Sequence, residues 1–332
     1  MASLDTASSP EQRDDMILPS VIDAIGGTPL VDLSRVVAHL GLEGRILAKL
    51  DYLMPGFSKK DRAARGIIEA AQADGSLLPG QTVVELTSGN MGTGLAIVCG
   101  VLGHPFVAVM SAGNSVERAR MMRALGAEVV IVPQNPGGTP GQVSGADLAC
   151  VEAAAQRITA ERGAFRADQF AHAANPAAHE TGTGPEIWDQ SDGVVTAFCD
   201  FAGSGGTLGG AARFFARHGV RCYAVEPEGA EVIAGGRSDR PDHPIQGGGY
   251  MMADLDHLRG APLAGHVTVS GAQARLHARL LAQCEGIFGG YSSGANLFAA
   301  AALLRERERG GCVAIVICDS GLKYLSTDLW DD

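Results

Sequence analysis

The stretch MPGFSKKDRAA, residues 54–64, holds the side chains most able to do chemistry. It follows an apolar, strand-like run and turns at a Pro-Gly pair, after which we expect a helix with Ser58 as its N-cap and Asp61 as the reciprocal partner in a capping box. Lys60 would then lie in the first helical turn, where unpaired N–H groups and the helix dipole disfavour an ammonium ion. Such a lysine either stays solvated at the surface or is tuned toward the neutral amine that a Schiff-base nucleophile requires.

Two glycine-rich loops are candidate anion sites. TSGNMG, residues 87–92, leaves a strand-like run and opens a helix, so its hydroxyls, amide and unpaired N–H groups suit a carboxylate or a phosphate. GSGGT, residues 203–207, also lies between a strand and a helix, and its N–H groups with the hydroxyls of Ser204 and Thr207 could surround a phosphate dianion. A dinucleotide fingerprint is the alternative for this second loop, but it would need glycine at Leu208.

A third loop, GYSSG at residues 290–294, matches the G-x-S-x-G pattern of hydrolase nucleophiles. A hydrolase of that kind needs a histidine after the serine, and the last histidine of this chain, His277, precedes it. The histidines also give no metal-ligand spacing, although His172 and His179 lie close in sequence. We therefore expect neither a serine hydrolase nor a metal centre.

Composition sets the class of protein. With 332 residues, 46% of them hydrophobic, the chain can form two lobes, and its net charge of −11 argues against nucleic acid or an anionic membrane as the main partner. No apolar stretch is long enough to span a bilayer, and the polar N-terminus, which we expect to be a loose arm, lacks the pattern of a secretion signal. Seven cysteines without CxxC spacing indicate reduced thiols in a cytoplasmic protein.

Short apolar runs alternate with helical patterns along the chain. Strands are expected at residues 83–86, 106–109, 129–132, 195–201, 220–225 and 313–317, with helices between them, for example at 115–125, 146–161 and 294–307. The Gly/Pro-rich residues 133–145 indicate a mobile surface loop. This alternation is typical of βαβ units, and so of an α/β fold with mostly parallel sheets covered by helices on both faces. Ligands of such folds bind beyond the carboxyl ends of the strands.

Taken together, the motifs resemble the cysteine synthase and cystathionine β-synthase family, fold-type-II enzymes that use pyridoxal 5′-phosphate (PLP). The resemblance covers roughly residues 22–329. It is carried by an ordered set: SKKDR with Lys60, TSGNMG, Gln169-Phe170, Asn175-Pro176, GPEIW at 184–188, GSGGT, GYSSG, DSG at 319–321 and KYLST at 323–327. It implies a two-lobed α/β enzyme with an N-terminal lobe at residues 1–170, a C-terminal lobe at residues 171–332, and a segment near 32–53 packed with the second lobe.

The resemblance also implies roles for individual residues. Lys60 would hold the PLP aldehyde as a Schiff base, and Lys59 occupies a variable position of the family. Asn90 would bond the cofactor's ring oxygen, while Ser292, with Asp319 as a rival, would face the pyridine nitrogen. The phosphate would be held by Gly203, Ser204, Gly205, Gly206 and Thr207, and the substrate by Thr87, Ser88, Met91 through its backbone, Gln169 and Gly247.

The reaction that the resemblance implies is a β-replacement. A serine-type amino acid (O-acetyl-L-serine, O-phospho-L-serine, serine or cysteine) would lose its β-substituent through an α-aminoacrylate and take up a small nucleophile, giving cysteine or another β-substituted alanine. A serine beside the pyridine nitrogen does not keep that nitrogen protonated, which favours elimination and replacement over transamination. The family further implies a homodimer.

The chain departs from the family pattern around the leaving group and the incoming nucleophile. Met54, Met91 and Ser204 stand where the family usually has asparagine, threonine and threonine, and the loop at residues 246–250 is shorter than the family's form. Met91 with Ser204 is reminiscent of the β-cyanoalanine synthase branch, so an unusual β-substituted alanine is as consistent with the residues as sulfide assimilation. The alternatives are serine/threonine dehydration and a non-catalytic binding protein, and the intact Lys60 argues against the latter.

Overall fold

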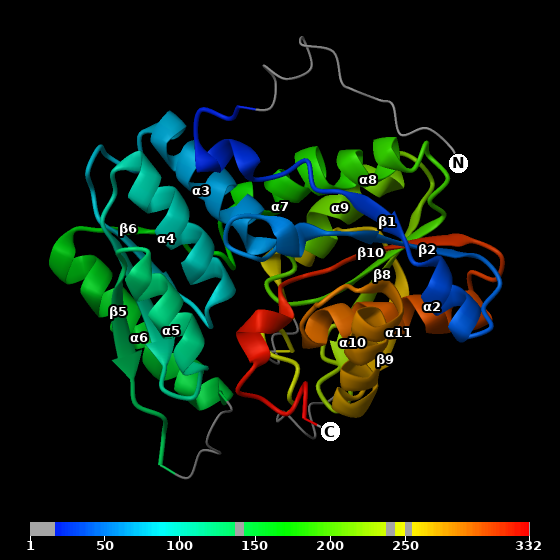
Figure 1. Ribbon diagram of the computed structural model, residues 1–332. Coiled ribbons are helices and arrows are strands. Elements are labelled where there is room, and N and C mark those ends of the chain that lie inside the picture. Colours follow the sequence, from blue (N-terminus) through cyan, green and yellow to red (C-terminus); the bar gives the residue numbers. More distant parts are fainter. Residues whose placement is uncertain (1–16, 137–142, 237–242, 250–253, 332) are drawn as a thin grey trace, which may run out of the picture.

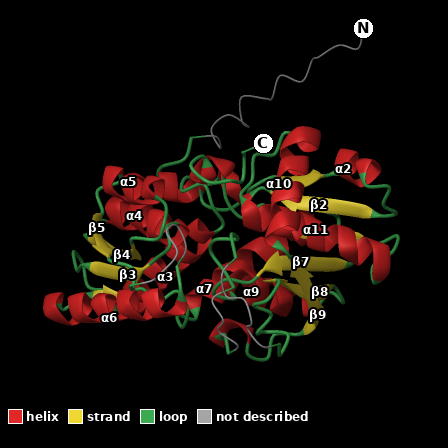
Figure 2. Ribbon diagram, turned by 90° about the horizontal axis from the view of Figure 1, so that it is seen from below, coloured by secondary structure: helices red, strands yellow, loops and turns green. Residues whose placement is uncertain are grey.

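The computed structural model describes residues 17–136, 143–236, 243–249 and 254–331. The expected N-terminal arm and the middle of the loop expected at 133–145 lie outside these ranges. Two sheets occupy opposite halves of the molecule, each with helices on both faces, as Figures 1 and 2 show. The expected α/β fold with mostly parallel sheets is therefore confirmed. Within the described ranges no helix has the length and apolar character needed to cross a membrane.

The smaller sheet has four parallel strands in the order β5-β4-β3-β6, with bounds β3 (Val83–Leu86), β4 (Phe106–Ser111), β5 (Glu128–Val132) and β6 (Phe165–Arg166). Side chains alternate between the faces of a strand, so Val83 and Val84 pack in different cores. The Val84 side faces α6 (Gly145–Arg162). The Val83 side faces the helices α3 (Lys60–Asp74), α4 (Asn90–Leu102) and α5 (Val116–Ala124).

The larger sheet has six strands in the order β1-β2-β10-β7-β8-β9, with bounds β1 (Leu30–Asp32), β2 (Arg45–Lys49), β7 (Ala197–Phe201), β8 (Arg221–Pro227), β9 (Leu263–Val269) and β10 (Cys312–Val316). Only the β1–β2 pair is antiparallel. β1 and β2 precede every strand of the smaller sheet in sequence, yet β2 pairs with β10. The chain thus begins in one sheet, builds the other, and returns.

Apolar helix faces cover both sides of this sheet. One core joins it to α2 (Ser34–His39), α10 (Gly271–Glu285) and α11 (Tyr291–Glu306), and the other to α8 (Gly184–Gln190) and α9 (Gly206–Ala216). Short α7 (Ala174–Ala178) and a π-helical turn (His179–Thr183) lead into α8. Single 3₁₀ turns lie at Val21–Ala24, Asp51–Leu53, Asp256–Leu258 and Gly321–Tyr324.

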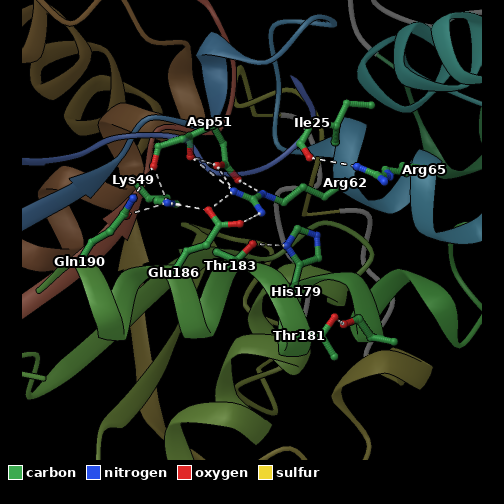
Figure 3. Close-up of polar contacts among 12 residues, drawn as sticks. Ile25, Lys49, Asp51, Arg62, Arg65, His179, Thr181, Thr183, Glu186 and Gln190 are labelled. Atoms are coloured by element: carbon green, nitrogen blue, oxygen red, sulfur yellow. Dashed lines mark hydrogen bonds and ion pairs between the residues drawn. The ribbon is translucent and has the colours of Figure 1, made fainter. Parts of the chain in front are cut away.

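An ion-pair network ties the start of α3 to the larger sheet (Figure 3). The Arg62 guanidinium on α3 donates to Asp51, just after β2, at 3.0 Å, and to Glu186 on α8 at 2.6 and 2.7 Å. Lys49 of β2 approaches the same Glu186 carboxylate at 2.6 Å. Because a buried ion pair needs close partners on every charged atom, this network fixes α3 relative to both β2 and α8.

Candidate active site

A cavity that is partly open to solvent lies where the loops after β3, β7 and β10 meet the start of α3. This is the carboxyl-terminal end of those parallel strands, where ligands of α/β folds bind. The structure brings nearly all the sequence-predicted site residues to this one cavity. Its lining includes Lys60, Ser88, Asn90, Met91, Gln169, Gly203, Ser204, Gly205, Gly206, Thr207, Gly247 and Ser292.

Lys60 is the first residue of α3. The prediction of a capping box between Ser58 and Asp61 is wrong. The Ser58 backbone pairs with Asp319, and the Ser58 hydroxyl is buried with no hydrogen-bond partner among the residues that the structure describes. The Asp61 carboxylate instead accepts the N–H of Gly56 at 2.5 Å. The turn before the helix is therefore held by Asp61 and by the strand end near Asp319, contacts that a local capping pattern does not include.

The Lys60 amine points at the glycine-rich loop: its Nζ donates to the Ser204 hydroxyl at 3.3 Å. Burial lowers the pKa of Lys60 to about 8, and the positive charge of the neighbouring Lys59 acts in the same direction. An amine with such a pKa is partly neutral near neutral pH, which is the form able to attack a carbonyl carbon.

Lys59 also lines the cavity, and sequence reasoning missed its role. Its Nζ donates to both carboxylate oxygens of Asp200, at 2.7 and 2.5 Å, and both side chains are almost fully buried. Burial lowers the pKa of Lys59, but the Asp200 charge outweighs burial and leaves it above the ordinary lysine value. A signal was present: Asp200 interrupts an otherwise apolar strand, AFCDF, and a buried carboxylate requires a charged or hydrogen-bonding partner.

The 203–207 loop is built so that only glycine fits at two positions. A Cβ on Gly203 would lie 2.4 Å from the Gly247 carbonyl oxygen, and one on Gly206 would lie 2.1 Å from Asn175 Oδ1. Asn175 also donates to the Ser204 hydroxyl at 3.1 Å. The loop runs into the N-terminus of α9, whose first N–H groups have no helical carbonyl to bond. Small residues, hydroxyls and these N–H groups make a cradle suited to an anion.

The conformation of the 87–92 loop is held by hydrogen bonds within the loop and by a bond from Arg118 on α5. The Thr87 hydroxyl accepts the N–H groups of Gly89 at 3.0 Å and Gly92 at 2.9 Å, so Thr87 supports the loop and is not part of the cavity lining. The buried Arg118 donates to the Ser88 carbonyl at 2.9 Å. Gly89 has a φ of +136°, and a Cβ there would lie 2.3 Å from Arg118 Cδ.

Asn90 is held by two side chains from the end of the chain. Its Nδ2 donates to Asp319 at 2.7 Å, and its Oδ1 accepts from Lys323, also at 2.7 Å. The Lys323 contact was not anticipated from sequence. Asp319 accepts a further bond from Tyr324 at 2.8 Å and does not line the cavity, whereas Ser292, in the first turn of α11, does.

Gln169 lines the same cavity as Lys60. Its side-chain Nε2 donates to the Leu86 carbonyl at 3.3 Å, and its backbone carbonyl accepts from the side chains of Asn175 at 2.6 Å and His257 at 2.8 Å. Gln169 therefore links the end of β3 to Asn175, which in turn contacts Ser204 of the cradle.

Comparison with known proteins identifies relatives over most of the chain. The profile of the family described as "Pyridoxal-phosphate dependent enzyme" matches residues 21–319. Cysteine synthase 3 of Caenorhabditis elegans is 38% identical over 317 residues, covering 93% of this chain and 89% of that protein. The crystal structure of O-ureido-L-serine synthase is 35% identical with a TM-score of 0.84, covering 95% of this chain and 96% of that one.

A third relative is O-acetyl serine sulfhydrylase isoform 3 of Entamoeba histolytica. Its crystal structure is 33% identical with a TM-score of 0.86, covering 99% of this chain and 95% of that one. Similarity of this extent includes every loop of the cavity. The chain therefore belongs to the family of pyridoxal-phosphate-dependent enzymes, as a cysteine synthase-like member that acts on small molecules.

Proposed function

We propose that this enzyme replaces the activated β-substituent of a serine-type amino acid by a small nucleophile, with Lys60 as the residue that bonds PLP. One observation carries the proposal: the Lys60 amine lies 3.3 Å from the Ser204 hydroxyl, inside the cavity that the 87–92 and 203–207 loops share. Bound there, PLP would supply an aldehyde for the lysine and a ring that withdraws electrons from the substrate's α-carbon.

The residues present fit PLP. The cradle at Gly203, Ser204, Gly205, Gly206 and Thr207 has no space for larger side chains at 203 and 206, so it is available to a phosphate held by backbone N–H groups. The Thr207 hydroxyl is oriented by His179, whose Nε2 lies at 3.2 Å. Asn90 and Ser292 line the same cavity and would contact the ring oxygen and the ring nitrogen.

Lys60 would act twice in the reaction. Its neutral amine would hold the cofactor in the resting enzyme, and the same Nζ, when free, would accept the α-proton of the substrate. The lowered pKa of about 8 suits both tasks, because a base works best when its pKa is near the working pH.

The 87–92 loop and Gln169 would bind the substrate carboxylate. Thr87 does not line the cavity; by accepting two loop N–H groups, its hydroxyl would hold the loop in the shape that binds the carboxylate. The N–H of Met91 and the hydroxyl of Ser88 belong to the same helix start, where an anion is favoured. Gly247 lines the same cavity and would lie near the substrate.

Absorption spectroscopy tests the proposal. The purified enzyme with PLP should show the visible band of a lysine-bound cofactor, and Lys60→Ala should abolish both that band and turnover. Arg157→Ala, on the exposed face of α6, is the matched control and should keep both. A native chain that shows no such band after PLP is added would refute the assignment.

The leaving group and the nucleophile require a direct screen. We would incubate the enzyme with O-acetyl-L-serine, O-phospho-L-serine, L-serine or L-cysteine, each with sulfide, cyanide or no nucleophile, and identify products by mass spectrometry. A β-substituted alanine is the expected product. Rapid pyruvate release without any added nucleophile would favour the serine/threonine dehydratase alternative instead.

We also propose that the enzyme is a cytoplasmic homodimer. Leu322 and Leu325 are 55 and 61% exposed and offer apolar surface for a subunit contact. All seven cysteines are free, which suits a reducing compartment. Light scattering of the purified protein and fractionation of the source cells test the two statements separately.

A further inference from the structure

Two neighbouring lysines, Lys59 and Lys60, line the cavity that would hold PLP. Only one amine can bond the single aldehyde of the cofactor, so something must select between them. The question rests on the proposed function, because it matters only if a lysine of this pair bonds PLP. The surroundings of the two amines differ in a way that provides an answer.

The Lys59 amine is held in place by Asp200, which also lines the cavity. Both carboxylate oxygens accept from Nζ, at 2.7 and 2.5 Å, and the Lys59 and Asp200 side chains are 10 and 2% exposed. The Lys59 backbone is anchored as well, since its N–H donates to the Cys318 carbonyl at 2.8 Å. Lys59 is thus held at both ends.

The Asp200 carboxylate is itself held in place. It belongs to β7, in the middle of the larger sheet, and accepts from Asn296 Nδ2 at 3.0 Å and from the Cys318 thiol at 3.6 Å. Asn296 is oriented by two backbone contacts, donating to Val316 at 2.9 Å and accepting from Phe201 at 2.7 Å. The carboxylate therefore cannot swing toward Lys60 without breaking this arrangement.

Lys60 has no such partner. Its amine contacts the Ser204 hydroxyl, and among the residues that the structure describes no carboxylate forms an ion pair with it. The charged and titratable groups that act on it are Lys59, Asp200, Cys318 and Glu85, and the largest of these influences is the like charge of Lys59. The pair thus places a fixed cation beside an amine that burial already drives toward its neutral form.

Bond formation to an aldehyde requires the neutral amine. The nitrogen lone pair adds to the carbonyl carbon, and one water molecule leaves as the carbon–nitrogen double bond forms. An ammonium ion has no lone pair to donate, so it must first lose a proton. A lysine held as an ammonium by a buried carboxylate is therefore excluded from the reaction, although it lies within the same cavity.

We propose that Asp200 selects which of the two adjacent lysines bonds the cofactor: by holding Lys59 as an ammonium ion, it leaves Lys60 as the sole amine able to react with the aldehyde. Asp200 and Lys59 are positioning residues, since they act through Lys60. The aspartate also fixes the position of the Lys59 amine, so charge and geometry act together.

Borohydride reduction followed by peptide mapping tests the proposal. Reduction makes the lysine–cofactor bond permanent, and mass spectrometry then locates the pyridoxyl group. The native enzyme should bear it on Lys60 throughout the range of about pH 6.5 to 9. Asp200→Asn leaves a buried cation unpaired, which drives Lys59 neutral, so label on Lys59 should rise at least about tenfold, the effect of one pKa unit on the neutral fraction.

A matched control is Glu226→Gln, which neutralises another buried carboxylate, on the neighbouring strand β8, and should leave the label on Lys60. Lys60→Ala tests the idea with Asp200 intact: we expect no label on Lys59, and we expect label there once Asp200→Asn is added. This single variant remains informative even if Asp200→Asn does not fold.

Two outcomes would overturn the proposal while leaving the proposed function intact: label on Lys59 of Lys60→Ala, or a folded Asp200→Asn enzyme labelled at Lys60 alone. Label on Lys59 of the native enzyme would overturn both the proposal and the assignment of Lys60. A native enzyme with no reducible label on either lysine would instead refute the proposed function. The two failures are therefore distinguishable in one experiment.

Discussion

At the scale of single residues, environment gives neighbouring side chains of one type opposite properties. Lys59 meets the Asp200 carboxylate and Lys60 meets the Ser204 hydroxyl, so one lysine is a fixed cation and the other is poised to lose its proton. Desolvation and neighbouring charge, the two causes of a lowered lysine pKa, both act on Lys60. The properties of this site thus depend on contacts between β7 and α3 rather than on residue type.

The Lys60 pKa predicts how stability depends on pH in the PLP-free enzyme. Folding lowers this pKa from 10.5 to about 8, so between these values the unfolded chain binds a proton that the folded chain has lost. Stability of the native chain should rise across this range relative to Lys60→Met, by at most about 3 kcal/mol and by less where solvent screens the charge. Urea unfolding at several pH values measures the difference, and a constant difference would contradict the shift.

Ser204 offers a second prediction at this scale. Ser204→Ala removes a hydroxyl that accepts from Lys60 and Asn175 and that we expect to contact the PLP phosphate. A hydrogen bond to a charged group contributes about 1.5–3 kcal/mol, so the dissociation constant for PLP should rise about 10- to 100-fold. Absorbance titration with PLP measures it. Ser204→Thr keeps the hydroxyl and serves as the control.

At the scale of elements, the sequence predicted the buried strands of this fold but not the contacts that begin helix α3. Strands such as residues 83–86 were predicted correctly because a strand that is buried on both faces has an unbroken run of mostly apolar residues. β9 was missed, since Leu263–Val269 contains glycine, histidine and threonine and is only partly buried at the sheet edge. The capping box failed because Ser58 pairs with Asp319 from the far end of the chain.

The loops of the site could be predicted from sequence, whereas the contacts between distant segments could not. The loops were found because glycine, hydroxyl and amide residues after a strand have a local signature, and the structure brings them to one cavity. Contacts between distant segments have no such signature. The Lys59–Asp200 pair and the Lys323–Asn90 bond each join parts of the chain that are remote in sequence. Asp200 within an apolar strand indicates that a polar partner is needed, but spacing alone does not identify which residue that partner is.

The 87–92 loop yields a prediction at the element scale. Gly89→Ala would place a methyl group against Arg118 and force a residue with a side chain into φ +136°, so the loop must shift. PLP binding should be retained, because the cradle lies on another element, whereas KM for the amino-acid donor should rise about tenfold for each 1.4 kcal/mol of lost binding.

Gly103→Ala is the matched control for that variant. Gly103 ends the same helix, α4, also with a positive φ of +79°, but a Cβ there meets nothing within 4 Å. It should cost about 1 kcal/mol of stability and leave KM unchanged. Equal effects of the two substitutions on KM would show that the loop does not bind the substrate.

At the scale of the whole molecule, the buried network around Arg62 connects the helix that carries Lys60 to the larger sheet (Figure 3). Removing one member leaves its partners charged and unpaired in a dry environment. Arg62→Met should therefore lower the free energy of unfolding by about 3–5 kcal/mol, measured by urea unfolding. Loss of the exposed pair in Arg157→Ala should change it by less than about 0.5 kcal/mol.

The same network predicts acid sensitivity. Burial raises the pKa of Glu186, but Arg62 and Lys49 outweigh burial and bring it to about 2, below the ordinary value of 4.5. The stabilising contribution of the Glu186 charge is therefore fully present above about pH 4.5 and is lost as pH falls toward 2. Glu186→Gln should be less stable than the native chain at neutral pH, and the gap should narrow over that interval; a gap independent of pH would contradict this.

The place of β10 has a consequence for biosynthesis. This strand, Cys312–Val316, inserts between β2 and β7, although it is the last of the chain's strands to be translated. As the nascent polypeptide leaves the ribosome, one edge of β2 stays unpaired until β10 has been translated. Unpaired strand edges promote aggregation. A premature stop codon before residue 312 would therefore remove the middle of a sheet rather than its margin, and the product should be insoluble.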